Sequence, residues 1–167
     1  MTDTLRTARP IDPAVLGRLR DTDDAGHACA PFTDAEGGAP LRCCLRRSGT
    51  GERIALVSYA PLRRWAAETW ARPGAYDEQG PVFIHAEECE GPGGEEGYPF
   101  ASPGALRTLR RYTADGRIEG GRLLEIPEAA TEAFDAAFAE AFANPEVVLV
   151  HVRAVEYGCF LFEVRRA

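Results

Sequence analysis

Hydrophobic residues recur along the chain in short runs, and the spacing of these runs predicts a mixture of strands and helices. The clearest period is the return of Phe134, Phe138 and Phe142 every four residues, which predicts a helix over residues 128–143. A second helix start is the pair Asp12-Pro13, with Asp in the N-cap position and Pro in the first turn. Both patterns indicate helices with one apolar face.

Runs of β-branched, aromatic and other apolar residues, bounded by turn residues, predict strands. Residues 41–47 and 53–59 flank a Gly-containing turn and predict a first hairpin, and residues 147–157 and 159–166 flank Gly158 and predict a second. Further strands are expected over residues 82–86 and 122–126, and short helices within residues 61–76 and over residues 106–111.

This order of elements predicts an α+β fold. Strands grouped in hairpins favour a mainly antiparallel sheet, and the long helix of the C-terminal half, with the short helices, is expected to pack on it. A chain of 167 residues that is 45% hydrophobic suits a single domain over residues 1–167, with residues 1–10 as a flexible N-terminus.

Charge and composition narrow the class of protein. The net charge of −7 works against binding to nucleic acid, so no nucleic-acid partner is predicted. No apolar run reaches signal-peptide or membrane-spanning length, which predicts no membrane partner and a cytoplasmic location. An odd number of cysteines, five, is typical of reduced thiols rather than of a disulfide framework. The absence of Lys and the many Arg, Ala and Gly residues indicate a GC-rich bacterial genome.

Candidate chemistry concentrates in residues 80–89, where an apolar run ends in a histidine, two carboxylates and a thiol. His85 and Glu87 would share one face of an extended strand, and a carboxylate beside an imidazole can hold its tautomer and raise its pKa. With Tyr76 they form the predicted catalytic set. The predicted ligand-binding residues are polar groups in or near strands that could reach the same pocket: Arg46, Ser58, Cys89 and Tyr157.

A nucleophilic pair of Cys89 and His85 is a second reading of the same segment. If residues 85–89 stay extended, the two side chains lie about 13 Å apart, which is too far for a hydrogen bond. A turn at residues 86–88 would be needed to bring them together.

Metal binding is a third reading. His85 and Cys89, with Cys43 or Cys44 and an acidic group such as Glu87 or Glu88, supply the ligand types of a zinc site. Their spacing along the chain lacks the paired short separations of zinc knuckles, and no CxxC occurs. The sequence therefore predicts no cofactor and no metal ligand, with zinc as the alternative.

Short motifs spread along the chain carry a family resemblance: RCCLR at residues 42–46, GER at 51–53, LVSYAP at 56–61, AY at 75–76 followed by GPVFI at 80–84, and RRY at 110–112 with Asp115. In this succession the chain resembles the bacterial family of domain of unknown function 1203 (DUF1203). The resemblance implies a small single-domain cytosolic α+β protein with no established activity, substrate or cofactor. The chain departs from the family pattern in residues 62–73, which look longer and carry both tryptophans.

Three functions follow as hypotheses. The first is a small-molecule binding or accessory module with its pocket near the end of the 80–89 segment. The alternative is a cofactor-independent acid/base enzyme, of isomerase, cyclase or dehydratase type, that uses His85 and a nearby carboxylate. The third is an interaction domain that offers a sheet edge to a partner. The apolar terminal hairpin also suggests a homodimer.

Overall fold

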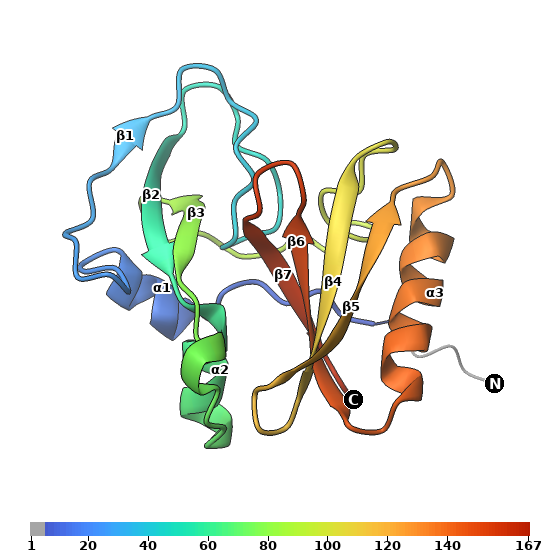
Figure 1. The fold of residues 1–167 in the computed structure, drawn as a ribbon. Coiled ribbons are helices and arrows are strands. Elements are labelled where there is room, and N and C mark those ends of the chain that lie inside the picture. The colour runs from blue at the N-terminus through green and yellow to red at the C-terminus, as the bar shows by residue number, and fades with distance from the viewer. Residues whose placement is uncertain (1–5) are drawn as a thin grey trace.

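The computed structural model describes residues 6–167, which form two antiparallel sheets, three α-helices and one short 3₁₀-helix (Figure 1). Residues 1–5, the first part of the segment expected to be flexible, lie outside the described residues. In the described part of residues 1–10, Arg9 donates its backbone N–H to the carbonyl of Glu163 at 2.8 Å. From there the chain crosses the molecule to the helix that begins at Pro13, as Figure 1 shows.

The first sheet has the order β1-β2-β3, and its strands are β1 (Phe32–Thr33), β2 (Arg53–Tyr59) and β3 (Gly80–His85). The register pairs Ile54 of β2 with His85 of β3. Helix α1 (Pro13–Leu19) packs beside this sheet, and it begins as predicted because the Asp12 carboxylate accepts the Ala14 N–H at 2.9 Å. Buried aliphatic side chains from both elements form the first core: Leu16, Leu19, Ile54, Val57, Val82 and Ile84.

The second sheet has the order β5-β4-β6-β7. Its strands are β4 (Leu106–Thr113), β5 (Ile118–Glu125), β6 (Val147–Ala154) and β7 (Phe160–Arg165). Helix α3 (Ala130–Ala143) lies against one face of this sheet, and Phe134 and Phe138 are fully buried there. The four-residue phenylalanine period is thus the buried stripe that the sequence predicted.

Helix α2 (Pro61–Thr69) packs against the second sheet and so links the two parts of the molecule. Its Leu62 and Trp65 contact Tyr112 of β4 and Leu149 of β6 in a separate small cluster. Phe160 of β7 also belongs to the first core. These contacts hold the first sheet, which carries the site described below, against the second.

Two secondary-structure predictions are wrong. Residues 41–47 form a tight turn rather than a strand, and β2 pairs with β1 and β3 instead. The turn closes on itself, because Leu41 donates its N–H to the carbonyl of Arg46 at 2.9 Å and Leu45 donates to Leu41 at 2.9 Å. Residues 106–111 belong to strand β4 and not to a helix. Half-buried and buried positions alternate over residues 106–110, and both neighbouring strands pair with this segment.

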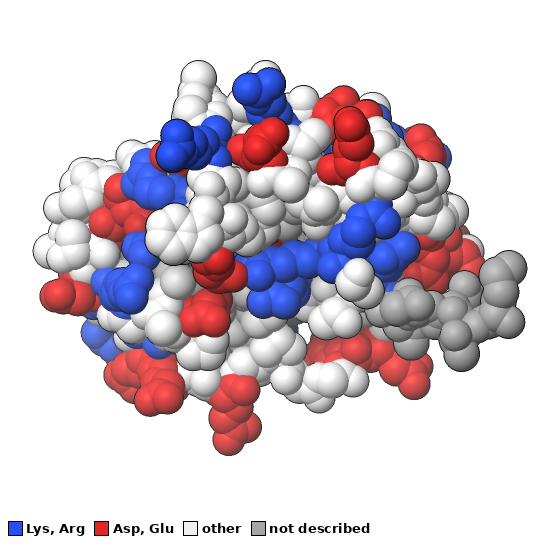
Figure 2. Space-filling view, turned by 90° about the horizontal axis from the view of Figure 1, so that it is seen from below, with Lys and Arg blue, Asp and Glu red and all other residues white. Residues whose placement is uncertain are grey.

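The surface mixes both signs of charge. Figure 2 shows the face at the lower end of Figure 1, where arginine and carboxylate groups lie next to one another. One ion pair of the described residues joins Arg165 and Glu68, with a separation of 2.8 Å. Among residues 6–167, no helix combines the length and the apolar character needed to cross a membrane.

Candidate functional site

Two adjacent thiols are held at the end of β3 by the tight turn over residues 41–46. Arg42 anchors this turn twice: its backbone N–H donates to Phe83 of β3 at 2.9 Å, and its buried Nε donates to the carbonyl of Phe160 at 2.7 Å. The Arg42 guanidinium is deeply buried, which lowers its pKa to about 10 and leaves it charged at neutral pH. This anchoring presents Cys43 and Cys44 to the same point in space.

The imidazole of His85 lies against both thiols. Its Nδ1 is 3.4 Å from Cys43 Sγ and 3.8 Å from Cys44 Sγ, while the two sulfur atoms are 3.9 Å apart. The backbone N–H of His85 also donates to Cys43 Sγ at 3.2 Å. Both cysteines are buried, and the His85 side chain is 13% exposed.

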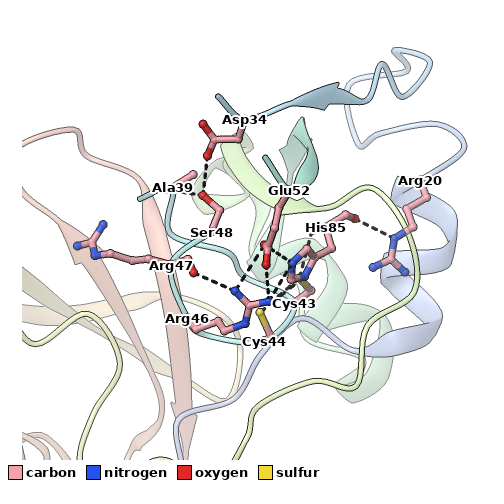
Figure 3. Close-up of polar contacts among 10 residues, drawn as sticks. All are labelled: Arg20, Asp34, Ala39, Cys43, Cys44, Arg46, Arg47, Ser48, Glu52 and His85. Atoms are coloured by element: carbon pink, nitrogen blue, oxygen red, sulfur yellow. Dashed lines mark hydrogen bonds and ion pairs between the residues drawn. The ribbon is translucent and has the colours of Figure 1, made fainter. Parts of the chain in front are cut away.

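The other ring nitrogen of His85 meets a carboxylate. Glu52 places Oε2 2.8 Å from Nε2, and its Oε1 accepts a bond from Arg46 Nη2 at 3.0 Å (Figure 3). The Arg46 guanidinium and then the His85 imidazole hold the pKa of Glu52 at about 2, so this carboxylate is ionised at neutral pH. The Glu52 carboxylate is closer to Nε2, at 2.8 Å, than the Arg46 guanidinium, whose Nη2 is 3.3 Å away, so Glu52 favours the His85 tautomer with its proton on Nε2. This tautomer leaves the Nδ1 lone pair facing the thiols.

The loop that carries Glu52 is itself braced, as Figure 3 shows. Ser48 donates its hydroxyl to Asp34 at 2.6 Å, and its Oγ accepts the N–H of Ala39 at 2.9 Å. The Asp34 N–H donates to the carbonyl of Glu52 at 2.8 Å. These bonds fix the position of the Glu52 backbone, and the Glu52 side chain points from this ordered loop toward His85.

A third thiol joins the group because the chain bends at Ala86 and Glu87. The bend turns Cys89 back toward β3, and the ligand atoms of Cys43, Cys44, His85 and Cys89 all lie within 4.8 Å of one another. The extended geometry that would separate His85 and Cys89 is therefore not the one adopted.

The two adjacent thiols differ in acidity. A hydrogen bond from Cys43, with His85 and Arg46 nearby, lowers the pKa of Cys44 to about 6 despite its burial. The same hydrogen bond and burial raise the pKa of Cys43, which therefore stays a thiol. Cys44 is the more nucleophilic of the pair at neutral pH and the better metal ligand.

These groups lie at one side of a cleft of about 690 Å³. Its walls carry more negative than positive side chains, with two guanidinium groups against five carboxylates. The cleft is lined by Cys44, Arg46, Glu52, Arg53, His85, Glu87, Glu88, Cys89, Glu90 and Glu95, together with Gly91 and Gly93.

Residues 38–166 match the model of a family described as a protein of unknown function, DUF1203. The chain belongs to the DUF1203 family. The matched segment contains every residue of the thiol and imidazole group and also Glu52 and Arg46. No curated protein and no solved structure matches the chain. The resemblance read from the short sequence motifs is thus confirmed at the level of the family.

This DUF1203 structure gathers some of the predicted site residues and separates others. His85, Glu87, Cys89 and Arg46 line the cleft together. The other three predicted residues lie elsewhere among the described residues. Tyr76 ends the 3₁₀-helix Gly74–Tyr76, Ser58 lies at the far end of β2 opposite Pro81, and Tyr157 is exposed in the turn between β6 and β7.

Sequence reasoning missed Glu52 as the carboxylate partner of His85 and named Glu87 in its place. The available signal was the Gly51-Glu52-Arg53 motif, which contributes to the family resemblance. Sequence reasoning also treated Cys43 and Cys44 as alternatives, whereas the turn presents both sulfur atoms to the same imidazole nitrogen.

Proposed function

We propose that this DUF1203 protein is a binding module for a small, positively charged ligand that occupies the cleft beside His85. The observation that carries the proposal is the composition of the cleft. Its lining has five carboxylates and two guanidinium groups, together with the thiols of Cys44 and Cys89 and the imidazole of His85. Its volume lies within the roughly 300–1,000 Å³ of known small-molecule sites. The excess of carboxylates favours a cation over an anion.

The contacts of His85 favour binding over acid/base catalysis. Both ring nitrogens already have protein partners, with thiols at Nδ1 and Glu52 at Nε2. A general base needs a nitrogen within hydrogen-bond reach of the substrate proton. His85 would have to give up one of these partners before it could accept a proton from a substrate.

The second candidate is the acid/base enzyme, with Glu52 rather than Glu87 as the carboxylate. The observation in its favour is the 2.8 Å contact between Glu52 and His85, because such a pair holds an imidazole in one tautomer. A pH profile of turnover that disappears in His85→Asn would support this candidate over simple binding.

Isothermal titration calorimetry with defined cations tests the binding function. The probes are spermidine and arginine methyl ester, each in the presence of a chelator, and Zn²⁺ without one, with citrate as the anionic comparison. We expect at least one cation to bind with a stoichiometry of one, and citrate not to bind. The absence of binding by all three cations, or binding of citrate alone, would contradict the proposal.

A triple variant locates the site. Glu87, Glu88 and Glu90 are exposed at the cleft, so changing all three to Gln removes three negative charges without disturbing the core. The matched control changes the exposed residues Glu125, Glu128 and Glu146 to Gln, which removes the same charge outside the cleft. The cleft variant should weaken the binding of the cation about threefold to 150-fold, since each of the three exposed pairs contributes about 0.2–1 kcal/mol. Equal affinities in the two variants would place the ligand elsewhere.

A further inference from the structure

The thiol and imidazole group at one side of the cleft has the composition and geometry of a metal site. We propose that Cys43, Cys44, Cys89 and His85 bind one zinc ion, or another thiophilic divalent metal ion of the same size. This inference rests on the proposed binding function and names the chemical class of its cationic ligand.

The first argument is geometric. A tetrahedral zinc ion with Zn–S bonds of about 2.3 Å and Zn–N bonds of about 2.0 Å requires S···S edges of about 3.8 Å and S···N edges of about 3.5 Å. Cys43 and Cys44 have their sulfur atoms 3.9 Å apart, and these atoms lie 3.4 Å and 3.8 Å from His85 Nδ1. Three ligands thus form one face of the required tetrahedron.

Cys89 supplies the fourth vertex. Its sulfur lies within 4.8 Å of each of the other three ligand atoms, so a movement of about 1 Å completes the tetrahedron. Cys89 is half-buried and belongs to the segment that follows β3, outside the regular strands. A side chain in this position can make such a movement without disturbing the sheet.

The second argument comes from the carboxylate that contacts the other ring nitrogen of His85. Metal-binding histidines usually donate their other ring N–H to a carboxylate, which fixes the tautomer and the ring orientation. His85 has this arrangement, because Glu52 accepts from Nε2 at 2.8 Å and Arg46 holds Glu52 in turn. The lone pair of Nδ1 is therefore directed at the thiols, as a metal ligand requires.

The third argument is chemical selectivity. Three sulfur atoms and one imidazole select zinc and similar soft or borderline metals over Mg²⁺ and Ca²⁺, which prefer oxygen ligands. Binding replaces the thiol protons by the metal and releases them to solvent, and three thiolates with Zn²⁺ carry a net charge of −1. The Arg46 guanidinium beside Glu52 and the His85 amide, which donates to Cys43 Sγ, offset part of that charge.

The four protein ligands also indicate what the metal does. Zinc sites with four protein ligands hold the ion and stabilise structure, whereas catalytic sites leave one position for water or substrate. Cys44 and Cys89 line the cleft, so the ion would be reached from solvent at one side. This combination suits a protein that binds, senses or transfers a metal ion rather than one that activates water with it.

Metal titration of the full-length reduced protein tests the proposal. Zn²⁺ affinity is measured by competition with a chromophoric chelator, and Co²⁺ is used as the spectroscopic probe. We expect one equivalent of Zn²⁺ to bind, and Co²⁺ to give thiolate charge-transfer absorption with intense tetrahedral d–d bands. A weak octahedral Co²⁺ spectrum without thiolate charge transfer would overturn the assignment.

Five single variants provide the matched series. Cys43→Ser, Cys44→Ser and Cys89→Ser should each weaken Zn²⁺ binding by more than about 100-fold, because loss of a ligand exceeds the 10–100-fold cost of losing an outer-shell partner. Cys29→Ser and Cys159→Ser remove thiols that do not belong to the group and should leave the affinity unchanged. Equal affinities of Cys89→Ser and Cys159→Ser would also overturn the assignment.

Two further measurements separate loss of a metal ligand from loss of the fold. Cys89 is half-buried, so Cys89→Ser should fold even if the buried variants do not, and circular dichroism without metal checks this. Zn²⁺ should slow alkylation of Cys89 by iodoacetamide but not that of Cys159. If Zn²⁺ fails to bind while spermidine or arginine methyl ester binds in the cleft, the metal assignment falls and the binding function stands. If none of them binds, both fall.

Discussion

His85 Nε2 lies 2.8 Å from Glu52 Oε2, although 33 residues separate the two along the chain. The contact follows from the pairing of β2 with β3, in which Ile54 lies opposite His85 and Glu52 extends beyond the strand end. Arg46 completes the arrangement by donating to the same carboxylate. One loop therefore positions the imidazole that faces three thiols.

The first prediction concerns this carboxylate. Glu52→Gln keeps the shape of the side chain but removes the charge that pairs with Arg46 and fixes the His85 tautomer. We expect Zn²⁺ affinity to fall about 10–100-fold while the tetrahedral Co²⁺ spectrum keeps its form, because the ligands themselves are unchanged. Glu36→Gln, at an exposed position outside the cleft, is the control. A Glu52→Gln protein that binds zinc as tightly as the control would show that Glu52 does not position His85.

The second prediction concerns Asp23, whose carboxylate joins a loop to β2. Its Oδ1 accepts from the N–H groups of Ala25 and His27 at 3.0 and 2.8 Å, and its Oδ2 accepts from Ser58 at 3.0 Å. Burial raises the pKa of Asp23, but these backbone donors outweigh it and hold the pKa below its ordinary value. Asp23→Asn should cost about 1–3 kcal/mol at pH 7, because its NH₂ group would face an N–H donor.

The sign of the pH dependence follows from the lowered pKa. The unfolded chain takes up the proton at a higher pH than the folded protein, so this stability is complete above the unfolded value of about 3.9 and is lost as pH falls through the folded value. Urea unfolding at pH 7 and pH 3 should therefore show a smaller difference between wild type and Asp23→Asn at pH 3. Asp21→Asn, at an exposed neighbouring position, should match wild type at both values. A difference that is constant with pH would contradict this account.

The third prediction concerns Leu45, which is buried with a φ of 59° in the turn that presents the thiols. Leu45→Ala should cost about 2–5 kcal/mol through lost packing. Leu45→Gly loses the same packing but relieves a left-handed conformation that costs about 1–2 kcal/mol, against about 0.5–1 kcal/mol of extra chain entropy. The Gly variant should therefore be as stable as the Ala variant or more stable, by up to about 1.5 kcal/mol.

Urea unfolding of both variants checks this order, and Leu109 in strand β4 provides the comparison. Leu109 is also buried but has ordinary strand geometry, so Leu109→Gly should be less stable than Leu109→Ala. The same order at both positions would show that the left-handed backbone at Leu45 stores no appreciable strain.

Much of the fold could be predicted from periodicity. The phenylalanine helix buries one repeating face, which is visible in the sequence as a period of four. The strands of the C-terminal hairpin are buried on both faces, and they are visible as β-rich runs about Gly158. Residues 41–47 have a strand-like composition, but they form a turn. Arg42 holds this turn through its buried side chain and its backbone bond to Phe83. These tertiary contacts cannot be predicted from local composition.

Some residues of the candidate site could likewise be found from the sequence, and others could not. His85 and Cys89 could be found because they stand four residues apart after an apolar run. Glu52 could not be paired with His85, because their contact depends on the register between β2 and β3, and a shift of one residue would turn Glu52 to the other face. The simultaneous approach of Cys43 and Cys44 depends on a turn whose left-handed residue is a leucine rather than a glycine, so its sequence carries no turn signal.

The fourth prediction concerns Trp70, the C-cap residue of α2. Trp70 has a φ of 64° and donates its N–H to Ala66 at 2.8 Å, and it is 90% exposed. A residue with a Cβ atom pays about 1–2 kcal/mol in this left-handed position, where glycine is the usual helix-ending residue. Because the ring is in solvent, Trp70→Gly loses little packing and should stabilise the protein by up to about 1.5 kcal/mol, after the entropy cost of about 0.5–1 kcal/mol for glycine. Thermal unfolding should then show a Tm higher by up to about 6 °C. Trp70→Ala keeps the Cβ atom and should leave the Tm near that of wild type, so a gain of equal size in both variants would mean that the ring, and not the backbone, is the source of the strain.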